Sequence, residues 1–136
     1  MELAHPPIAT FLMFDGQAEE AMNLYTSLFP DSKIISLTRY GPDEAGSEGT
    51  VQQASFSLNG QAFRCMDSSI KHDFTFTPSI SIFVTFGTEE ELDRVYAALS
   101  RDGKVLMPLA AYPFSEKFAW IADRFGVSWQ LNLAQN

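Results

Sequence analysis

The chain has 136 residues, 46% of them hydrophobic, and a formal net charge of −8. This length predicts one domain with a sizeable apolar core. The acidic balance argues against nucleic acid and anionic membranes as partners, because both are bound through clustered Lys and Arg. No apolar run reaches the roughly 18 residues of a membrane span, and no signal peptide is visible. A single cysteine, Cys65, fits a reducing compartment. We therefore expect a cytoplasmic protein.

The first half of the chain predicts a strand, a helix and three further strands. Residues 8–14 are typical of a buried strand, and residues 17–29 carry a one-sided apolar stripe that predicts a helix ending at Pro30. Asn59-Gly60 is a strong hairpin signal, because both residue types accept a positive φ. The remaining strands predicted for this half are residues 34–40, 50–58 and 61–67.

The second half repeats that order after an irregular connector at residues 68–78. Thr88 and Glu91 form the pattern of a capping box, which predicts a helix start. Tyr112 lies on the loop that precedes the last hairpin, where a lid over a ligand could form. The strands predicted for this half are residues 79–86, 105–109, 117–122 and 127–133.

The two halves also resemble each other in sequence. Residues 14–28 and 86–99 both leave an apolar run, turn through Gly, show acidic residues and enter a helical pattern. We therefore predict an α+β fold with two βαβββ repeats, at about residues 7–67 and about 78–134, in a single domain. Two such repeats can curl their sheets around one cavity, which would be the functional site.

Three segments carry a resemblance to a known family. Residues 11–21, 74–79 and 122–130 resemble the PhnB-like branch of the vicinal oxygen chelate superfamily, which includes glyoxalase I, bleomycin-resistance proteins and extradiol dioxygenases. The branch is often labelled 3-demethylubiquinone-9 3-methyltransferase. The resemblance implies two βαβββ modules forming an open, cup-shaped mixed sheet, commonly in a homodimer. A Gly-rich turn for S-adenosylmethionine is not visible, since Asp15-Gly16 is followed by no second glycine.

Enzymes of this superfamily usually hold a divalent metal through His, Glu or Gln on the first and last strands of each half. Of the matching side chains here, only Gln130 can coordinate a cation, and Arg64 would repel one. The matching positions are Ala9 or Thr10, Arg64, Ser79 or Ser81, and Gln130.

Other candidate metal ligands are also missing. Gln53 stands where PhnB-like relatives can carry a His. His5 and His72 lie in the N-terminal segment and the connector, where histidines are usually surface residues. We therefore predict neither a metal site nor a cofactor.

Strand alternation and the resemblance together select the residues that could line a ligand site. Arg64 either pairs with a carboxylate such as Asp67 or Asp123, or holds the anionic end of a ligand through its planar fork. Trp120 and Trp129 are core residues or rings that stack on a ligand. The candidate ligand-binding residues are Gln53, Arg64, Ser81, Tyr112, Trp120 and Gln130.

Three classes of function remain open, and two of them involve a ligand site. The leading one is a PhnB-like homodimer that binds a small molecule in a metal-free cup. The other is an enzyme with lyase, isomerase, dioxygenase-like or 3-demethylubiquinone-9 3-methyltransferase activity, whose catalytic residues we do not assign. A structural dimer with a filled cup is a third reading, and it would have no cavity.

Overall fold

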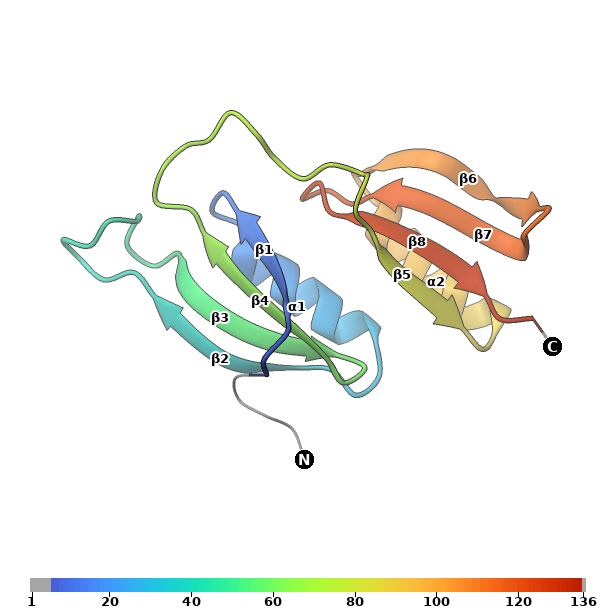
Figure 1. The fold of residues 1–136 in the computed structure, drawn as a ribbon, viewed down its shortest axis with the longest axis horizontal. Coiled ribbons are helices and arrows are strands. Elements are labelled where there is room, and N and C mark those ends of the chain that lie inside the picture. The colour runs from blue at the N-terminus through green and yellow to red at the C-terminus, as the bar shows by residue number, and fades with distance from the viewer. Residues whose placement is uncertain (1–5, 136) are drawn as a thin grey trace. The chain divides into compact units, whose positions relative to one another are not determined.

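The computed structural model describes residues 6–135. The chain divides between His72 and Asp73 into two compact units, which we call the first and second unit (Figure 1). The boundary lies within the predicted connector. No helix in the part of the chain described here is long and apolar enough to cross a membrane.

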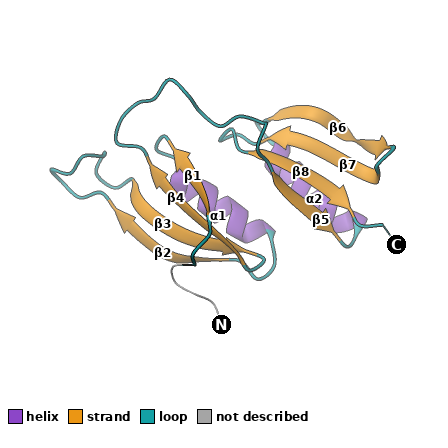
Figure 2. Ribbon diagram, in the orientation of Figure 1, coloured by secondary structure: helices purple, strands orange, loops and turns teal. Residues whose placement is uncertain are grey.

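The first unit is a four-stranded sheet with one helix on one of its faces (Figure 2). The strand order is β1-β4-β3-β2, with β1 parallel to β4 and the other pairs antiparallel. Its elements are β1 (Thr10–Phe14), α1 (Ala18–Leu28), β2 (Lys33–Arg39), β3 (Val51–Leu58) and β4 (Gln61–Asp67).

The second unit repeats this topology strand for strand. Its order is β5-β8-β7-β6, again with one parallel pair, β5 and β8. The elements are β5 (Ile82–Phe86), α2 (Glu89–Ser100), β6 (Lys104–Tyr112), β7 (Ser115–Ala122) and β8 (Ser128–Leu133). The predicted α+β fold with two βαβββ modules is therefore confirmed.

The core of each unit lies between its helix and the sheet face beneath it. In the first unit the rings of Phe56 and Phe63 stack at 5.2 Å between centroids, and α1 buries the stripe that the sequence predicts, including Met22 and Tyr25. In the second unit Trp129 is completely buried, which confirms it as a core residue. We call the opposite, helix-free side of each sheet its open face.

The two helices begin in different ways. The Thr88 hydroxyl accepts a hydrogen bond from the Glu91 amide at 3.2 Å, which confirms the predicted cap of α2. At the start of α1 the carboxylate of Asp67, from the end of β4, accepts bonds from the amides of Gly16 (2.8 Å) and Ala18 (2.9 Å). A negative charge there also suits the helix dipole. One β4 side chain thus fixes where α1 begins.

The hairpin between β3 and β4 has the predicted geometry. Asn59 and Gly60 have φ values of 50° and 83°. Two successive positive φ angles define the type I′ turn, whose twist matches that of the flanking strands. The prediction for Asn59-Gly60 is confirmed.

Strand boundaries in the second unit differ from the prediction. β6 continues to Tyr112 and forms a hairpin with β7, so Tyr112 ends a strand rather than lying in a long loop. Pro108 lies inside β6, as the predicted strand 105–109 required, although proline donates no ladder hydrogen bond. β6 is an edge strand with irregular register, which tolerates a missing donor. β5 begins at Ile82, which leaves Ser79 and Ser81 outside the strand.

Candidate functional site

The open face of the first unit carries a row of side chains that crosses all four strands. Ser36 on β2 pairs with Ser55 on β3, Ser55 pairs with Arg64 on β4, and Arg64 pairs with Phe11 on β1. Their sequence neighbours Leu12, Ala54 and Cys65 are buried on the helix side, because successive side chains of a strand alternate. We call Ser36, Ser55, Arg64 and Phe11 the Arg64 row.

Arg64 lies at the centre of this row and has no hydrogen-bond or ion-pair partner among the described residues of the first unit. Its Nε is buried, and it is the one such side-chain atom within residues 6–135 that has no hydrogen-bond partner. The guanidinium forms no ion pair with any residue in that range. The nearby hydroxyls of Ser36 and Ser55 bond to each other at 2.7 Å.

The predicted pairing of Arg64 with Asp67 is wrong. Asp67 projects to the helix side and accepts hydrogen bonds from the amides of Gly16, Ala18 and Val51. The other carboxylate considered, Asp123, lies in the second unit and holds its own turn: it accepts from the amides of Phe125 and Val127 at 2.9 and 3.0 Å and from the Trp129 indole at 2.9 Å. Within the first unit, Asp67 therefore does not neutralise Arg64.

The open face of the second unit carries an equivalent row. Met107 pairs with Trp120, Trp120 pairs with Gln130, and Gln130 pairs with Phe83. Because Phe11 pairs with Arg64 as Phe83 pairs with Gln130, the predicted equivalence of Arg64 and Gln130 is confirmed. We call Met107, Trp120, Gln130 and Phe83 the Gln130 row.

Polar groups around Gln130 are joined by hydrogen bonds. The Gln130 amide donates to the Ser81 hydroxyl at 3.2 Å, and that hydroxyl bonds Ser128 at 2.6 Å. The Trp120 indole donates to Ser128 at 2.9 Å. Three of the predicted ligand-binding residues, Ser81, Trp120 and Gln130, therefore meet in one network, and Trp120 lies half-buried on the open face rather than in the core.

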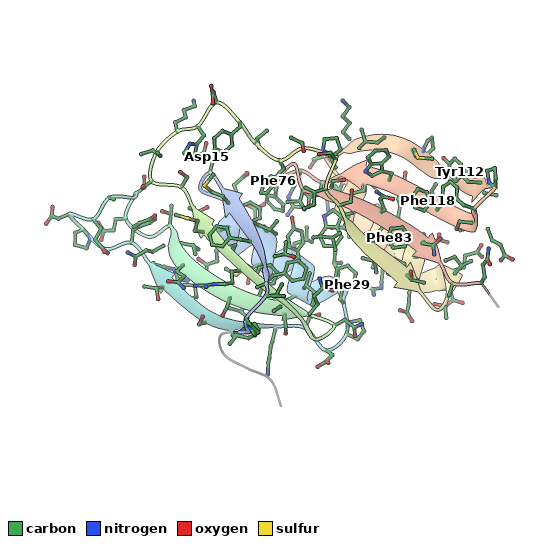
Figure 3. All side chains as sticks on the ribbon, viewed as in Figure 1. Asp15, Phe29, Phe76, Phe83, Tyr112 and Phe118 are labelled. Carbon is green, nitrogen blue, oxygen red and sulfur yellow. The ribbon has the colours of Figure 1, made fainter. Side chains whose placement is uncertain are left out.

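Tyr112 belongs to an aromatic cluster at the β6–β7 hairpin (Figure 3). Its ring stacks on Phe114 at 5.6 Å and meets the edge of Phe118 at 5.9 Å. Its hydroxyl donates to the Pro108 carbonyl at 2.6 Å. Phe118 in turn contacts Phe83 of the Gln130 row, with centroids 6.3 Å apart. Tyr112 is thus fixed by its neighbours and lies beside the Gln130 row.

The last predicted ligand residue, Gln53, is on the open face of the first unit but outside the Arg64 row. It is exposed and pairs with Thr38. Cys65 points to the helix side, and burial, followed by the charge of Asp67, raises the pKa of its thiol to about 12. A thiol with so high a pKa is a poor nucleophile, which supports the interpretation of Cys65 as a core residue.

Comparison with known proteins identifies the family. Residues 6–132 match the model of the 3-demethylubiquinone-9 3-methyltransferase family. The chain belongs to this family. It is a PhnB-like member, and its fold is that of the vicinal oxygen chelate superfamily. No curated protein matches the chain.

Solved structures of relatives support this assignment. A PhnB protein from Bacillus cereus is 59% identical and has a TM-score of 0.93, over 95% of this chain and 100% of that one. Protein PA1353 from Pseudomonas aeruginosa is 25% identical with a TM-score of 0.81, over 97% and 100%. A glyoxylase/bleomycin resistance protein/dioxygenase domain from Frankia sp. EAN1pec shares the fold at 13% identity and a TM-score of 0.65, over 97% and 94%.

At the superfamily's metal positions, this PhnB-like chain has few ligands. Arg64 and Gln130 occupy the last strands, and Ser81 bonds Gln130. No group of three or more His, Cys, Asp or Glu side chains gathers anywhere in residues 6–135. His5 lies outside the described residues, and His72 lies in the connector. In the second unit, Gln130 and Ser81 therefore offer a cation one amide oxygen and a hydroxyl. In the first unit, the equivalent position carries a guanidinium, which offers no lone pair.

Sequence reasoning missed the residues that lie beside Arg64 on the open face. Ser36 and Ser55 were not selected, because hydroxyl residues are common on exposed strand faces. Ser36 could not be paired with Ser55 from alternation alone, since the β2–β3 register shifts between Ile34 and Ser36. Such a bulge changes which residues share a face. Phe11 could have been found by counting strand positions, since it sits opposite Arg64 as Phe83 sits opposite Gln130.

Proposed function

We propose that this PhnB-like protein binds a small organic molecule on the open faces of its sheets, without a bound metal. One observation carries the proposal. In each unit an exposed aromatic ring lies beside polar groups, and the rings occupy equivalent register positions in the two units. Phe11 is 52% exposed next to Arg64, and Phe83 is 57% exposed next to Gln130. Apolar surface with a few fixed polar groups is typical of small-molecule sites.

The chemistry of the two rows supports binding rather than a structural role. An exposed Phe on a sheet face leaves apolar surface in water, and covering it contributes about 25 cal/mol per Å². The hydrogen-bonding groups beside the rings would then orient what covers them. Because the residues at the superfamily's metal positions include a guanidinium, the ligand contacts we propose are hydrogen bonds and ring contacts instead of coordination to a metal.

A screen of small aromatic fragments by two-dimensional ¹H–¹⁵N NMR tests the proposal. We expect several fragments to shift amide signals of β1, β4, β5 and β8 in a saturable way. Phe11→Ser and Phe83→Ser should weaken those shifts at their own row. Ile70→Ser, at an exposed residue of the connector, is the matched control and should leave them unchanged. Fragments that shift only residues outside the two open faces would refute the proposal.

The second candidate function is the methyltransferase activity that the family description names. It requires S-adenosylmethionine to bind, so a thermal shift with this compound separates the candidates. Elemental analysis of the purified protein tests the further expectation that no metal is bound. Stabilisation by S-adenosylmethionine that survives the Phe11 and Phe83 substitutions would favour a separate catalytic site.

We also propose that the protein is a cytoplasmic homodimer. Large apolar side chains are exposed in each unit, among them Ile8 in the first and Ile80 and Phe114 in the second, and covering such side chains would stabilise a dimer. The single, buried thiol suits a reducing compartment. Light scattering coupled to size-exclusion chromatography should give twice the 15.2 kDa chain mass. A monomer at micromolar concentration would refute the dimer.

A further inference from the structure

We propose that the ligand of the first unit carries an oxyanion, a carboxylate or a phosphate, which Arg64 holds through its guanidinium. The inference rests on the proposed small-molecule function and adds the chemical class of the ligand. The Ser36 and Ser55 hydroxyls and the Phe11 ring complete the subsite. The ligand is therefore an acid with an apolar or aromatic body.

Arg64 has no structural partner among the described residues of the first unit. A guanidinium presents five N–H donors and no acceptor, and buried polar atoms are nearly always hydrogen-bonded. Yet the buried Nε of Arg64 has no acceptor, and the charge has no counterion within residues 6–135. A carboxylate or phosphate supplies the missing acceptor and the missing counterion at once, because two of its oxygens match the fork of the guanidinium.

The open face of the first unit has no acidic side chain on its strands. Arg64 and Lys33 are the charged side chains among the strand positions that we assign to that face by register, and both are basic. An oxyanion bound there would meet no like charge from the sheet, even though the whole chain is acidic. These positions are Phe11, Met13, Lys33, Ser36, Thr38, Gln53, Ser55, Ser57, Ala62, Arg64 and Met66.

The residues on either side of Arg64 complete the subsite. The Ser36 and Ser55 hydroxyls share one hydrogen bond, and either can be its donor, so one of their two protons remains to be donated elsewhere. Ser55 is directly opposite Arg64, and cross-strand neighbours have Cβ atoms about 4.5–5.5 Å apart. When Ser36 donates to Ser55, the Ser55 proton is free to bond the same oxyanion as Arg64. On the other side, the exposed ring of Phe11 offers apolar contact to the rest of the ligand.

The equivalent position in the second unit shows why the anion site is confined to the first. Gln130 is neutral, and its amide nitrogen already donates to Ser81. Ser81 and Ser128 are bonded to each other and to the Trp120 indole. That network has no net charge to attract an anion. The same register position thus carries an unpaired cation in one unit and a paired amide in the other.

The test compares benzoate and phenyl phosphate with the neutral amide benzamide. Each is titrated into the full chain and followed by ¹H–¹⁵N NMR. We expect either or both anions to shift the amides of Ser36, Ser55 and Arg64 with at least tenfold higher affinity than benzamide. Whichever of them binds more tightly identifies the oxyanion as carboxylate or phosphate. Raising the salt concentration should weaken the anions and leave benzamide unchanged.

Three variants separate the role of Arg64 from general effects of charge or stability. Arg64→Met should lower the affinity for the anions at least tenfold, and Arg64→Lys, which keeps the charge but lacks the fork, should lower it less. Arg39→Met is the matched control, because Arg39 is an exposed arginine of the same unit that pairs with Glu19. It should leave the affinity unchanged.

The outcomes distinguish this inference from the broader function. If benzamide binds the Arg64 row as tightly as benzoate, or if Arg64→Met binds the anions like the parent chain, the oxyanion subsite is wrong while small-molecule binding stands. If none of the three probes shifts the row, the oxyanion subsite is wrong as well, and the fragment screen then decides the broader function separately. If Arg64→Lys and Arg64→Met both bind the anions like the parent chain, Arg64 takes no part in binding them, even if one of the variants is less stable.

Discussion

Replacing Arg64 by Met should stabilise the protein while it removes the proposed anion contact. A buried donor without a partner costs about 1–3 kcal/mol relative to a satisfied one, and Arg64 buries its Nε in that state. Met keeps an apolar stem of similar length, so the packing contributed by the arginine stem is largely retained. The rest of the guanidinium is not fully buried, which reduces the gain. We expect the free energy of unfolding to rise by about 0.5–1.5 kcal/mol.

The assay must report on the unit that contains Arg64. Both tryptophans, Trp120 and Trp129, lie in the second unit, so indole fluorescence would follow the wrong part of the chain. Urea unfolding is therefore followed by far-ultraviolet circular dichroism, with the slope of the free energy against urea compared between variants. A gain of about 1 kcal/mol corresponds to a rise in Tm of roughly 3–5 °C for a chain of this size.

Arg39→Met is the control for the loss of an arginine. Its ion pair with Glu19 is largely exposed, and such pairs contribute about 0.2–1 kcal/mol. We therefore expect a small destabilisation for Arg39→Met and a stabilisation for Arg64→Met. If Arg64→Met instead lowers the free energy of unfolding by more than about 1 kcal/mol, the guanidinium supports the fold and the reasoning above is refuted.

Three further changes test the scaffold around the site. Asp67→Asn should lower the free energy of unfolding in urea by about 2–3 kcal/mol. An amide side chain cannot accept from all three backbone N–H groups and would turn a donor toward one of them, such as that of Val51. A loss under about 0.5 kcal/mol would contradict this anchoring role. Cys65 should resist a thiol reagent at pH 8 unless the protein unfolds. The pKa of its thiol rises from 9.0 to about 12 on folding, so its contribution to stability is complete below pH 9 and is lost as the pH rises toward 12; rapid labelling of folded protein would contradict the burial. Thr88→Ala should lower stability by about 1 kcal/mol, since the Glu91 amide loses its acceptor, and Thr88→Ser should restore most of it.

Local signals in the sequence were sufficient to predict most of the fold. The capping pair Thr88 and Glu91 set the start of α2, and Asn59-Gly60 set the β3–β4 turn, because each depends only on residues that are close in the chain. The start of α1 could not be derived in this way. It depends on Asp67, which is 49 residues from Ala18 in sequence, and no local pattern links them.

The candidate site was predictable where strand alternation is regular. Arg64 and Gln130 each lie four residues after a turn glycine, so their equivalence followed from counting, and the strand register confirms it. The role of Arg64 was less predictable, since a partner such as Asp67 looks equally near in sequence. Only the register shows that Asp67 and Arg64 point to opposite sides of β4. Ser36 was hidden by the bulge in β2, because one extra residue changes the side that each later residue faces.

The contrast between neighbouring residues of one strand explains how this fold can vary its ligand without losing stability. Cys65 and Leu131 lie one residue after Arg64 and Gln130, and both are completely buried beneath a helix. Changes there alter packing in a close-packed core and cost stability. Arg64 and Gln130 lie on the same strands as these two residues but face away from the helices. Their side chains can therefore change chemistry while the sheet stays intact. The duplicated scaffold carries a cation at one of these positions and a neutral amide at the other, and this difference makes the first unit the place for an acidic ligand.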